Sequence, residues 1–232
     1  MSEQTALDVL GGVGAIITNS HIVYASGKHG KAYINKDALY PHVSLTADLC
    51  GEMITPFYVN GVGVDFGVVV GPEKGGIILS QWAAYNSAHV WERDRNIFAV
   101  YAEKEVVSIP DPEDRGRKCF VETGKFVFNR GYDKFVAGKR VLVVEDVLTT
   151  GGSVKKVVEA VRAAGGEVVG VAALCNRGNV KPEDIGGVPK LHSLVNVTLD
   201  MWDESDCPLC ERNVPINTDV GKGREFLARK QA

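Results

Sequence analysis

The sequence has no apolar run long enough to span a bilayer, because Gly, Asp or Lys interrupts each of its longest hydrophobic stretches. It also lacks an excess of positive charge. The formal net charge is -3 and the pI about 6.0, which argues against a general nucleic-acid or membrane-surface binder. Residues 1–4 contain no basic segment followed by an apolar one, so we expect no secretory signal. Internal repeats and low-complexity linkers are absent as well.

Cysteine is scarce: there are five, an odd number, and they are scattered apart from Cys207-Pro-Leu-Cys210. This distribution argues against a disulfide framework and favours a cytoplasmic protein. Cys207 and Cys210 have the spacing of a zinc knuckle, but zinc needs four ligands and no second Cys-x-x-Cys exists. Cys175, His192 or the knuckle of a second subunit are the candidates for the remaining ligands. The alternative is a turn with two free thiols.

Three continuous apolar runs, at 66–70, 141–144 and 168–174, are typical of strands buried on both faces of a parallel sheet. Helical patterns lie between them at 76–88 and 153–164, and Gly165-Gly166 is a good stop for the second. Strands that alternate with helices predict an α/β fold with a parallel, Rossmann-like central sheet flanked by helices. Further elements are expected from the N-terminal pattern: a helix at 4–17, a short strand at 21–24 and a helix at 44–53.

Two segments break this rhythm. Residues 104–140 are long, charged and rich in Pro and Gly, which is typical of a functional excursion or of a plain surface loop. The stretch after Asp200 is again irregular. We therefore expect one main domain over residues 1–200 and a C-terminal appendage with the cysteine knuckle over 201–232.

The most informative segment runs from Val141 to Ser153. An apolar strand ends in two acids, Glu145 and Asp146, and is followed by a turn rich in hydroxyls and glycines and then by a helix. Ligands of open α/β sheets bind beyond the carboxyl ends of the strands. Glycines and the free N–H groups of a helix start suit a phosphate, whereas carboxylates suit sugar hydroxyls or a divalent cation.

A turn of this kind would also serve as a plain helix cap, and paired acids at a strand end are often merely solvated. The combination of both on a Val-rich strand is hard to explain as structure alone. It is not a Walker loop, because no Gly-Lys-Ser/Thr follows the glycines. A kinase-like phosphate site is disfavoured for the same reason.

This segment resembles the signature of the type I phosphoribosyltransferases, which bind 5-phosphoribosyl-1-pyrophosphate (PRPP). The resemblance implies that fold, with a small hood from the N-terminal residues and a long flexible flap at about 104–140. It also implies that Glu145 and Asp146 hold the ribose hydroxyls. By the same resemblance, the 5′-phosphate is wrapped by Val147, Leu148, Thr149, Thr150, Gly151, Gly152 and Ser153.

Other segments are similar to the orotate branch of that family. They are Ser26-Gly27 with Tyr33, the Gly-Pro-x-x-Gly-Gly-Ile pattern of residues 71–77, and the run 101–105 that leads into the flap. The likeness implies a pyrophosphate loop with Glu73, Lys74 and Gly75, and a catalytic Lys104 beside Asp146. Arg177 stands where that branch places a base-contacting arginine, and its fork of donors suits a planar carboxylate or a pyrimidine oxygen.

The sequence departs from that branch in two places. Ala25 stands where a lysine commonly contacts the orotate carboxylate, so Lys28, with Lys31 as a further candidate, would have to substitute beside Tyr33. In the flap only Lys104 survives, because Val107 and Ile109 occupy the places of a second lysine and a histidine. The later basic residues of the flap are candidate replacements for the missing charge: Arg115, Arg117, Lys118, Lys125 and Arg130.

The resemblance implies an enzyme that uses Mg²⁺ with PRPP and transfers ribose 5-phosphate to a nucleobase, with orotate as the expected acceptor. It also implies a homodimer in which each flap serves the neighbouring site. Two alternatives stay open: transfer to another purine or pyrimidine base, and a non-catalytic relative that senses PRPP. The weakened flap fits a sensor, but no basic helix-turn-helix precedes residue 20.

Overall fold

The computed structural model describes residues 1–24, 26–59, 63–90, 96–112, 116–197 and 200–231. The chain forms two compact units. Unit 1 combines the two ends of the sequence, residues 1–45 and 195–232, and unit 2 comprises residues 46–194. In the described ranges, no helix is long and apolar enough to cross a membrane.

Unit 2 is built on a six-stranded sheet with the order β12-β11-β10-β7-β8-β9. The pairs β11/β10, β10/β7 and β7/β8 are parallel, and β8/β9 is antiparallel. The predicted parallel α/β sheet is therefore confirmed. Its strands are β7 (Val68–Pro72), β8 (Phe98–Pro110), β9 (Lys118–Val127), β10 (Arg140–Leu148), β11 (Glu167–Asn176) and β12 (Leu191–Asn196).

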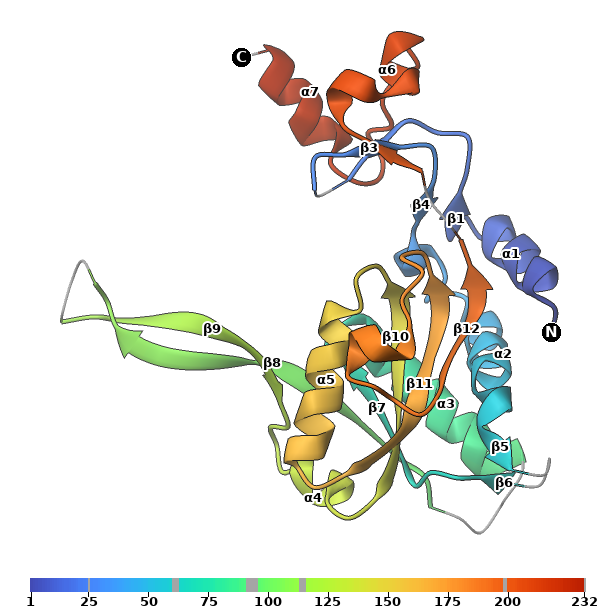
Figure 1. Cartoon of the computed structure of the whole chain (residues 1–232), viewed down its shortest axis with the longest axis vertical. Coiled ribbons are helices and arrows are strands. Elements are labelled where there is room, and N and C mark those ends of the chain that lie inside the picture. Colours follow the sequence, from blue (N-terminus) through green and yellow to red (C-terminus); the bar gives the residue numbers. More distant parts are fainter. Residues whose placement is uncertain (25, 60–62, 91–95, 113–115, 198–199, 232) are drawn as a thin grey trace. The chain divides into compact units, whose positions relative to one another are not determined.

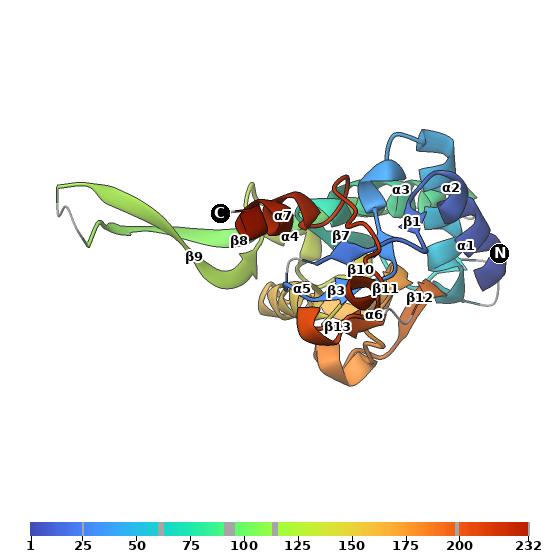
Figure 2. The same cartoon turned by 90° about the horizontal axis from the view of Figure 1, so that it is seen from above.

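Helices cover both faces of this sheet. In Figures 1 and 2, α5 (Gly152–Ala163) lies on one face, and α2 (Val43–Ile54) and α3 (Gly75–Val90) lie on the other. Val141 to Val144 of β10 are fully buried because both sides of this central strand are covered. The smaller elements of this part of the chain are η2 (Thr55–Phe57), β5 (Tyr58–Val59), β6 (Gly63–Val64), α4 (Asp133–Val136) and η3 (Pro182–Ile185).

The helix after β10 ends where its glycines require. Gly165 has φ +80°, a left-handed conformation that glycine adopts without penalty. Its N–H donates to the carbonyl of Arg162 and the N–H of Gly166 to that of Val161, which satisfies the last carbonyls of α5. The first helix, by contrast, ends earlier than predicted. α1 spans Glu3–Gly12 rather than reaching Ile17, since Gly14 takes φ +71° and turns the chain into β1.

Much of the segment expected to be an irregular flap is regular. β8 and β9 form a long antiparallel hairpin that extends well beyond the rest of the sheet (Figures 1 and 2). Its outer part carries exposed apolar side chains, although a hairpin surrounded by water has no core that would require them. They are Val106, Val107, Ile109, Phe120 and Val121.

Unit 1 brings N-terminal and C-terminal segments together. β3 pairs with β2 on one side and with β13 on the other, so a strand near residue 30 lies between strands near residues 22 and 201. The elements of this unit are α1 (Glu3–Gly12), β1 (Ile16–Ile17), β2 (Ile22–Val23), β3 (His29–Gly30), β4 (Tyr33–Ile34), η1 (Lys36–Ala38), β13 (Met201–Trp202), η4 (Glu204–Asp206), α6 (Pro208–Glu211) and α7 (Gly223–Gln231).

Candidate active site

The acid pair lies toward the carboxyl end of β10, which is one of the two central strands of the sheet. Glu145 and Asp146 are 6% and 5% exposed, so both carboxyl groups are buried rather than solvated. The N–H of Asp146 donates to the Glu145 carboxylate over 3.1 Å, and the N–H of Val147 donates to the Asp146 carboxylate over 2.6 Å. These local bonds hold the acids at the mouth of the loop that follows.

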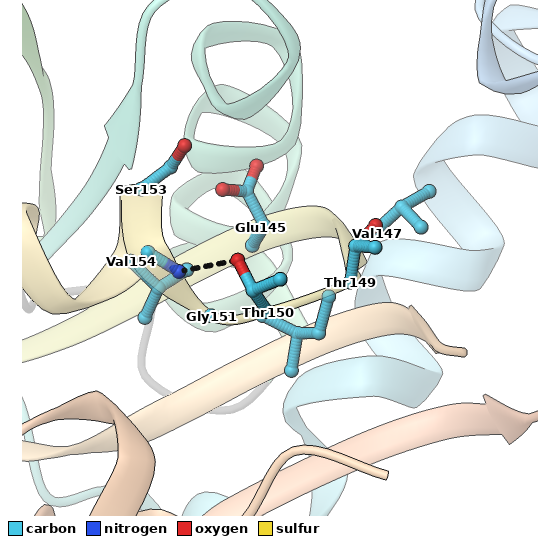
Figure 3. Close-up of a pocket in the computed structure, with 9 residues that line it drawn as sticks. Glu145, Val147, Thr149, Thr150, Gly151, Ser153 and Val154 are labelled. Carbon is cyan, nitrogen blue, oxygen red and sulfur yellow. Dashed lines mark hydrogen bonds between the residues drawn. The ribbon is translucent and has the colours of Figure 1, made fainter. Parts of the chain in front are cut away.

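That loop surrounds a pocket of about 110 Å³. Figure 3 shows the Glu145 carboxylate and the Ser153 hydroxyl reaching the same side of the loop from β10 and from the start of α5. Asp146 is not among the lining residues, so of the two acids only Glu145 faces this pocket. The lining consists of Glu145, Val147, Leu148, Thr149, Thr150, Gly151, Gly152, Ser153 and Val154.

The backbone of the loop depends on Gly151. This residue takes φ +73° at the N-cap of α5, and a Cβ there would approach Ile185 Cγ2 to 2.5 Å. The Thr150 hydroxyl accepts a 3.4 Å hydrogen bond from the Gly152 N–H (dashed in Figure 3). The first amides of α5 therefore open onto the pocket with the positive end of the helix dipole behind them, which favours an anion.

Arg177 is tied to the same loop from the neighbouring strand. Its guanidinium Nε donates to the Thr149 hydroxyl over 2.8 Å, and its backbone N–H donates to the Leu148 carbonyl over 2.9 Å. Gly178 allows this approach, because a Cβ there would lie 1.6 Å from the carbonyl oxygen of Thr149. The structure thus brings the predicted base-binding arginine next to the predicted phosphate loop.

The second glycine loop connects β7 to α3. β7 is parallel to β10 and next to it, so both loops leave the sheet at the same edge. Gly71 and Gly76 are in close contact, since a Cβ on Gly71 would lie 2.1 Å from the Gly76 carbonyl oxygen. Between them, Glu73 is half-buried and Lys74 exposed, and the peptide that joins these two is cis.

Lys104 lies on β8, in the hairpin, and does not line the pocket beside Glu145. Its ammonium group forms an ion pair with Glu122 of β9 at 3.0 Å, with both side chains about half exposed. Of the other flap cations, Arg130 forms an ion pair with Glu103, and the Glu103 carboxylate raises the pKa of that guanidinium. Arg115 lies outside the described residues.

The remaining predicted site residues belong to unit 1. Lys28 forms an ion pair with Asp203 at 3.1 Å, and Tyr33 is half-buried in β4. Ala25, the position that departs from the orotate branch, lies outside the described residues.

Cys207 and Cys210 are also in unit 1, and their neighbours were not foreseen. His21 and His29 approach the two thiols, whereas the expected partners Cys175 and His192 lie in β11 and β12 of unit 2. Cys175 and His192, two of the candidates named from the sequence, are not members of this group of four side chains. Two histidines eight residues apart beside a short strand were the available signal, but nothing in the sequence linked them to a knuckle near residue 207.

Comparison with known proteins agrees with this geometry. A family model for the phosphoribosyl transferase domain matches residues 63–201. The orotate phosphoribosyltransferase of Desulforamulus reducens is 32% identical over 215 residues, which cover 93% of this chain and 95% of that protein. The orotate phosphoribosyltransferase of Caldanaerobacter subterraneus subsp. tengcongensis is 35% identical over 201 residues, with 87% and 88% covered.

Solved structures show the same fold. The orotate phosphoribosyltransferase of Mycobacterium tuberculosis in complex with inorganic phosphate superposes with a TM-score of 0.56 at 24% identity, covering 84% of this chain and 95% of that one. The adenine phosphoribosyltransferase of Rhodothermus marinus superposes with a TM-score of 0.51 at 23% identity, covering 84% and 99%.

A mostly parallel α/β sheet with an acid pair and an anion loop beyond its central strand defines a protein that binds a phosphorylated sugar or nucleotide. The chain belongs to the phosphoribosyltransferase family, in its orotate-type branch. The resemblance found in the sequence is thereby confirmed.

Proposed function

We propose that this protein transfers ribose 5-phosphate from PRPP to orotate, giving orotidine 5′-phosphate and pyrophosphate, a step of pyrimidine biosynthesis. The observation that carries the proposal is the pocket after β10, where one buried carboxylate and a cup of hydroxyls and amides meet. The curated relatives that cover most of the chain bear the name of that activity.

The donor requires two opposite kinds of recognition in one place. Its 5′-phosphate is an anion and suits the amides and hydroxyls from Thr149 to Ser153 at the start of α5. Its ribose hydroxyls donate hydrogen bonds and suit the carboxylates of Glu145 and Asp146. The pocket volume of about 110 Å³ fits the phosphate end of the donor rather than a whole nucleotide.

The acceptor would bind next to this loop. The guanidinium of Arg177 presents a planar set of donors that matches a carboxylate or a pyrimidine oxygen. The Thr149 hydroxyl accepts a hydrogen bond from Nε, which holds this guanidinium against the proposed phosphate loop. Lys28 and Tyr33 of the N-terminal segment are the further candidates for contacts with the base.

In the reaction, a ring nitrogen of orotate attacks C1 of the ribose while the bond from C1 to pyrophosphate breaks. The nitrogen gives up its proton and pyrophosphate leaves with the bonding electron pair. The protein has no need of a nucleophile of its own. It contributes by holding both substrates in line and by neutralising charge on the leaving group.

Mg²⁺ would enter with PRPP and offset the negative charge of its pyrophosphate. The protein groups suited to this end of the donor are the loop from Gly71 to Gly76 with Lys74, and Lys104 of the flap. The carboxylates of Glu145 and Asp146 are oxygen ligands of the kind that Mg²⁺ prefers, or acceptors for a hydrated ion.

The flap would act across a homodimer. Lys104 lies in the hairpin, pairs with Glu122 and does not line the pocket of its own chain. The outer hairpin exposes apolar residues, with Phe120 76% exposed, and a second subunit would cover such a surface. Closure of the hairpin over the neighbouring site would exclude water and prevent hydrolysis of PRPP. All five cysteines are free, which fits a protein that works in the reducing cytoplasm.

The deciding experiment is an assay of the purified protein with PRPP, Mg²⁺ and a panel of bases, following the loss of orotate absorbance and, for the other bases, release of pyrophosphate. We expect turnover with orotate and little with adenine, hypoxanthine or uracil. Preferred turnover of another base would move the protein to a different acceptor. PRPP binding by calorimetry without turnover of any base would favour a sensor and overturn the proposal.

A further inference from the structure

Four side chains with metal-binding atoms meet in unit 1, whereas Glu145, Asp146 and Lys104 belong to unit 2. They are His21, His29, Cys207 and Cys210, and their ligand atoms all lie within 4.8 Å of one another. His21 directly precedes β2 and His29 is the first residue of β3, whereas Cys207 is the N-cap of α6 and Cys210 lies within that helix. Figures 1 and 2 show these N-terminal and C-terminal segments side by side within the unit.

Four of the distances between ligand atoms are close to the edges of a tetrahedron around one ion. Cys207 Sγ and Cys210 Sγ each lie 3.7 Å from His21 Nε2, Cys210 Sγ lies 3.3 Å from His29 Nδ1, and the two ring nitrogens are 2.9 Å apart. A tetrahedral zinc site with its usual bond lengths places sulfur and nitrogen ligands about 3.5 Å apart, and two nitrogens about 3.3 Å apart. Small outward shifts of the rings would admit the ion.

The orientation of the His21 ring is fixed by a contact on the side opposite the two cysteines. Its Nδ1 lies 2.7 Å from the backbone carbonyl oxygen of Val214, an acceptor that requires the proton on Nδ1. The lone pair of Nε2 is then directed at the two sulfurs. A ligating histidine commonly donates its second N–H to a backbone carbonyl in this way, which sets both tautomer and ring orientation.

His29 is fully buried and finds its polar contacts only in this cluster among the described residues. Its Nε2 has no hydrogen-bond partner there, and its ring packs edge-on against Phe226 with centroids 5.0 Å apart. A buried imidazole without strong partners is costly. Coordination through Nδ1 would give the ring one strong partner on the side that faces His21 and Cys210.

The donor set also specifies the ion. Two thiolates and two neutral imidazoles cancel the charge of a divalent cation, which suits a site where three of the four residues are buried. Sulfur and imidazole ligands in a tetrahedron select zinc over magnesium or calcium. Four protein ligands leave no open position for water or substrate, so the site is structural.

We propose that His21, His29, Cys207 and Cys210 bind one zinc ion that fastens the C-terminal segment to the N-terminal segment. The ligands are separated by more than 180 positions in the sequence, so the ion would close a very long loop. The turn between β2 and β3 also carries Lys28 and is joined to the C-terminal segment by the Lys28–Asp203 ion pair. The ion would therefore hold in place a turn that supplies a candidate base contact.

The first test is the metal content of the full chain, purified without a metal-affinity tag, measured by plasma mass spectrometry. We expect about one zinc per chain in the wild type and in Cys119→Ser, which changes a cysteine of the hairpin. Cys207→Ser and Cys210→Ser should each lose it. Zinc retained in full by both variants, or absent from the wild type after purification in zinc-containing buffer, would overturn the proposal.

A second test does not depend on whether the variants fold. Wild-type protein is stripped with a chelator under reducing conditions and titrated with Co²⁺. We expect intense visible bands of tetrahedral cobalt, near-ultraviolet thiolate-to-cobalt charge transfer, saturation at one ion per chain, and displacement of cobalt by zinc. The weak spectrum of an octahedral ion, or no spectrum at all, would contradict the site. The melting temperature should fall on stripping and recover with zinc.

Discussion

Nε of Arg177 donates to Oγ1 of Thr149 over 2.8 Å, so the end of β11 is held by the loop that follows β10. The proposed acceptor contact and the proposed phosphate cup thus share one hydrogen bond. A substitution in the loop should therefore weaken binding of the acceptor base, although the loop itself would contact only the donor.

Thr149→Val tests this coupling, because it removes the hydroxyl acceptor and keeps the volume of the side chain. We expect the KM for orotate to rise about tenfold or more, since a hydrogen bond to a charged group contributes about 1.5–3 kcal/mol. Thr149→Ser keeps the hydroxyl and should stay near wild type. Steady-state kinetics with each substrate varied in turn would check it. Equal KM values for orotate in the two variants would contradict the coupling.

Glu145→Gln should weaken the donor site while leaving the fold intact. The substitution keeps the shape but replaces a charged acceptor of ribose hydroxyls, so we expect kcat/KM for PRPP to fall about 10- to 100-fold. Glu159→Gln, on the exposed side of α5, is the matched control and should be neutral. Unchanged kinetics in Glu145→Gln would remove this carboxylate from the site.

Gly151→Ala and Gly152→Ala separate backbone strain from loss of a glycine. At Gly151 a side chain must adopt φ +73° and meets Ile185, so we expect a loss of about 1–2 kcal/mol in the free energy of unfolding from the dihedral alone. At Gly152 the added Cβ makes an ordinary 3.5 Å contact with the Thr150 hydroxyl. Urea denaturation should show Gly152→Ala near wild type and Gly151→Ala clearly destabilised. Equal stability of the two variants would mean that the left-handed turn is not required.

The proposed exchange of flaps predicts complementation between two variants of reduced activity. Lys104→Ala should lose about 10²- to 10³-fold in kcat, as expected when a group that stabilises the leaving charge is removed. Mixing it with Glu145→Gln under conditions of subunit exchange should restore activity, because one site of each hybrid dimer combines an intact pocket with an intact flap. About a quarter of wild-type activity is the ceiling for random pairing of a dimer.

A flap that serves its own chain would leave every site in the hybrid with one defect, and the mixture would stay at reduced activity. Phe120→Asp is an independent check, because it places a charge on the most exposed apolar side chain of the hairpin. We expect this variant to shift toward monomer in sedimentation velocity. A wild-type protein that is already monomeric at assay concentrations would rule out the exchange.

Four of the five thiols should react in a fixed order with a chromogenic disulfide reagent at pH 8. Cys119 is partly exposed on β9 and should react first. Cys207 and Cys210 should react only after a chelator is added. Burial raises the pKa of Cys50 to about 12, so this residue stays a thiol and should react only after denaturation. Prompt reaction of Cys207 and Cys210 without chelator would contradict the zinc site.

The sequence was sufficient to predict the central strands of the sheet in unit 2. β10 and β11 are valine-rich because both of their faces are buried, and such runs have few other interpretations. The pocket after β10 could be expected from the same strand, since its glycines, hydroxyls and first acid lie within a dozen residues of one another in the sequence. The short N-terminal strands were harder to place, because β1 to β4 span two residues each and depend on distant partners.

Long-range contacts explain what could not be predicted. The pairing of β3 with β13 joins residues 30 and 201, and no local pattern announces it. His21 and His29 were overlooked as metal ligands for this reason. The prolines and charges of this segment predict an irregular excursion, whereas the structure shows the two paired strands β8 and β9. The apolar residues of these strands are exposed, so they suit contact with a partner rather than a core, and the usual pattern of a buried strand is missing.

Because unit 1 combines segments from both ends of the sequence, the two units can complete their folding only in a certain order during translation. Unit 2 takes a continuous stretch, residues 46–194, and its sheet and phosphate loop have all their residues before the last segment is translated. Residues 1–45 must wait for β13 before β3 has both its neighbours. A nascent chain would thus hold the residues of the unit 2 sheet before β3 of unit 1 has both of its neighbouring strands.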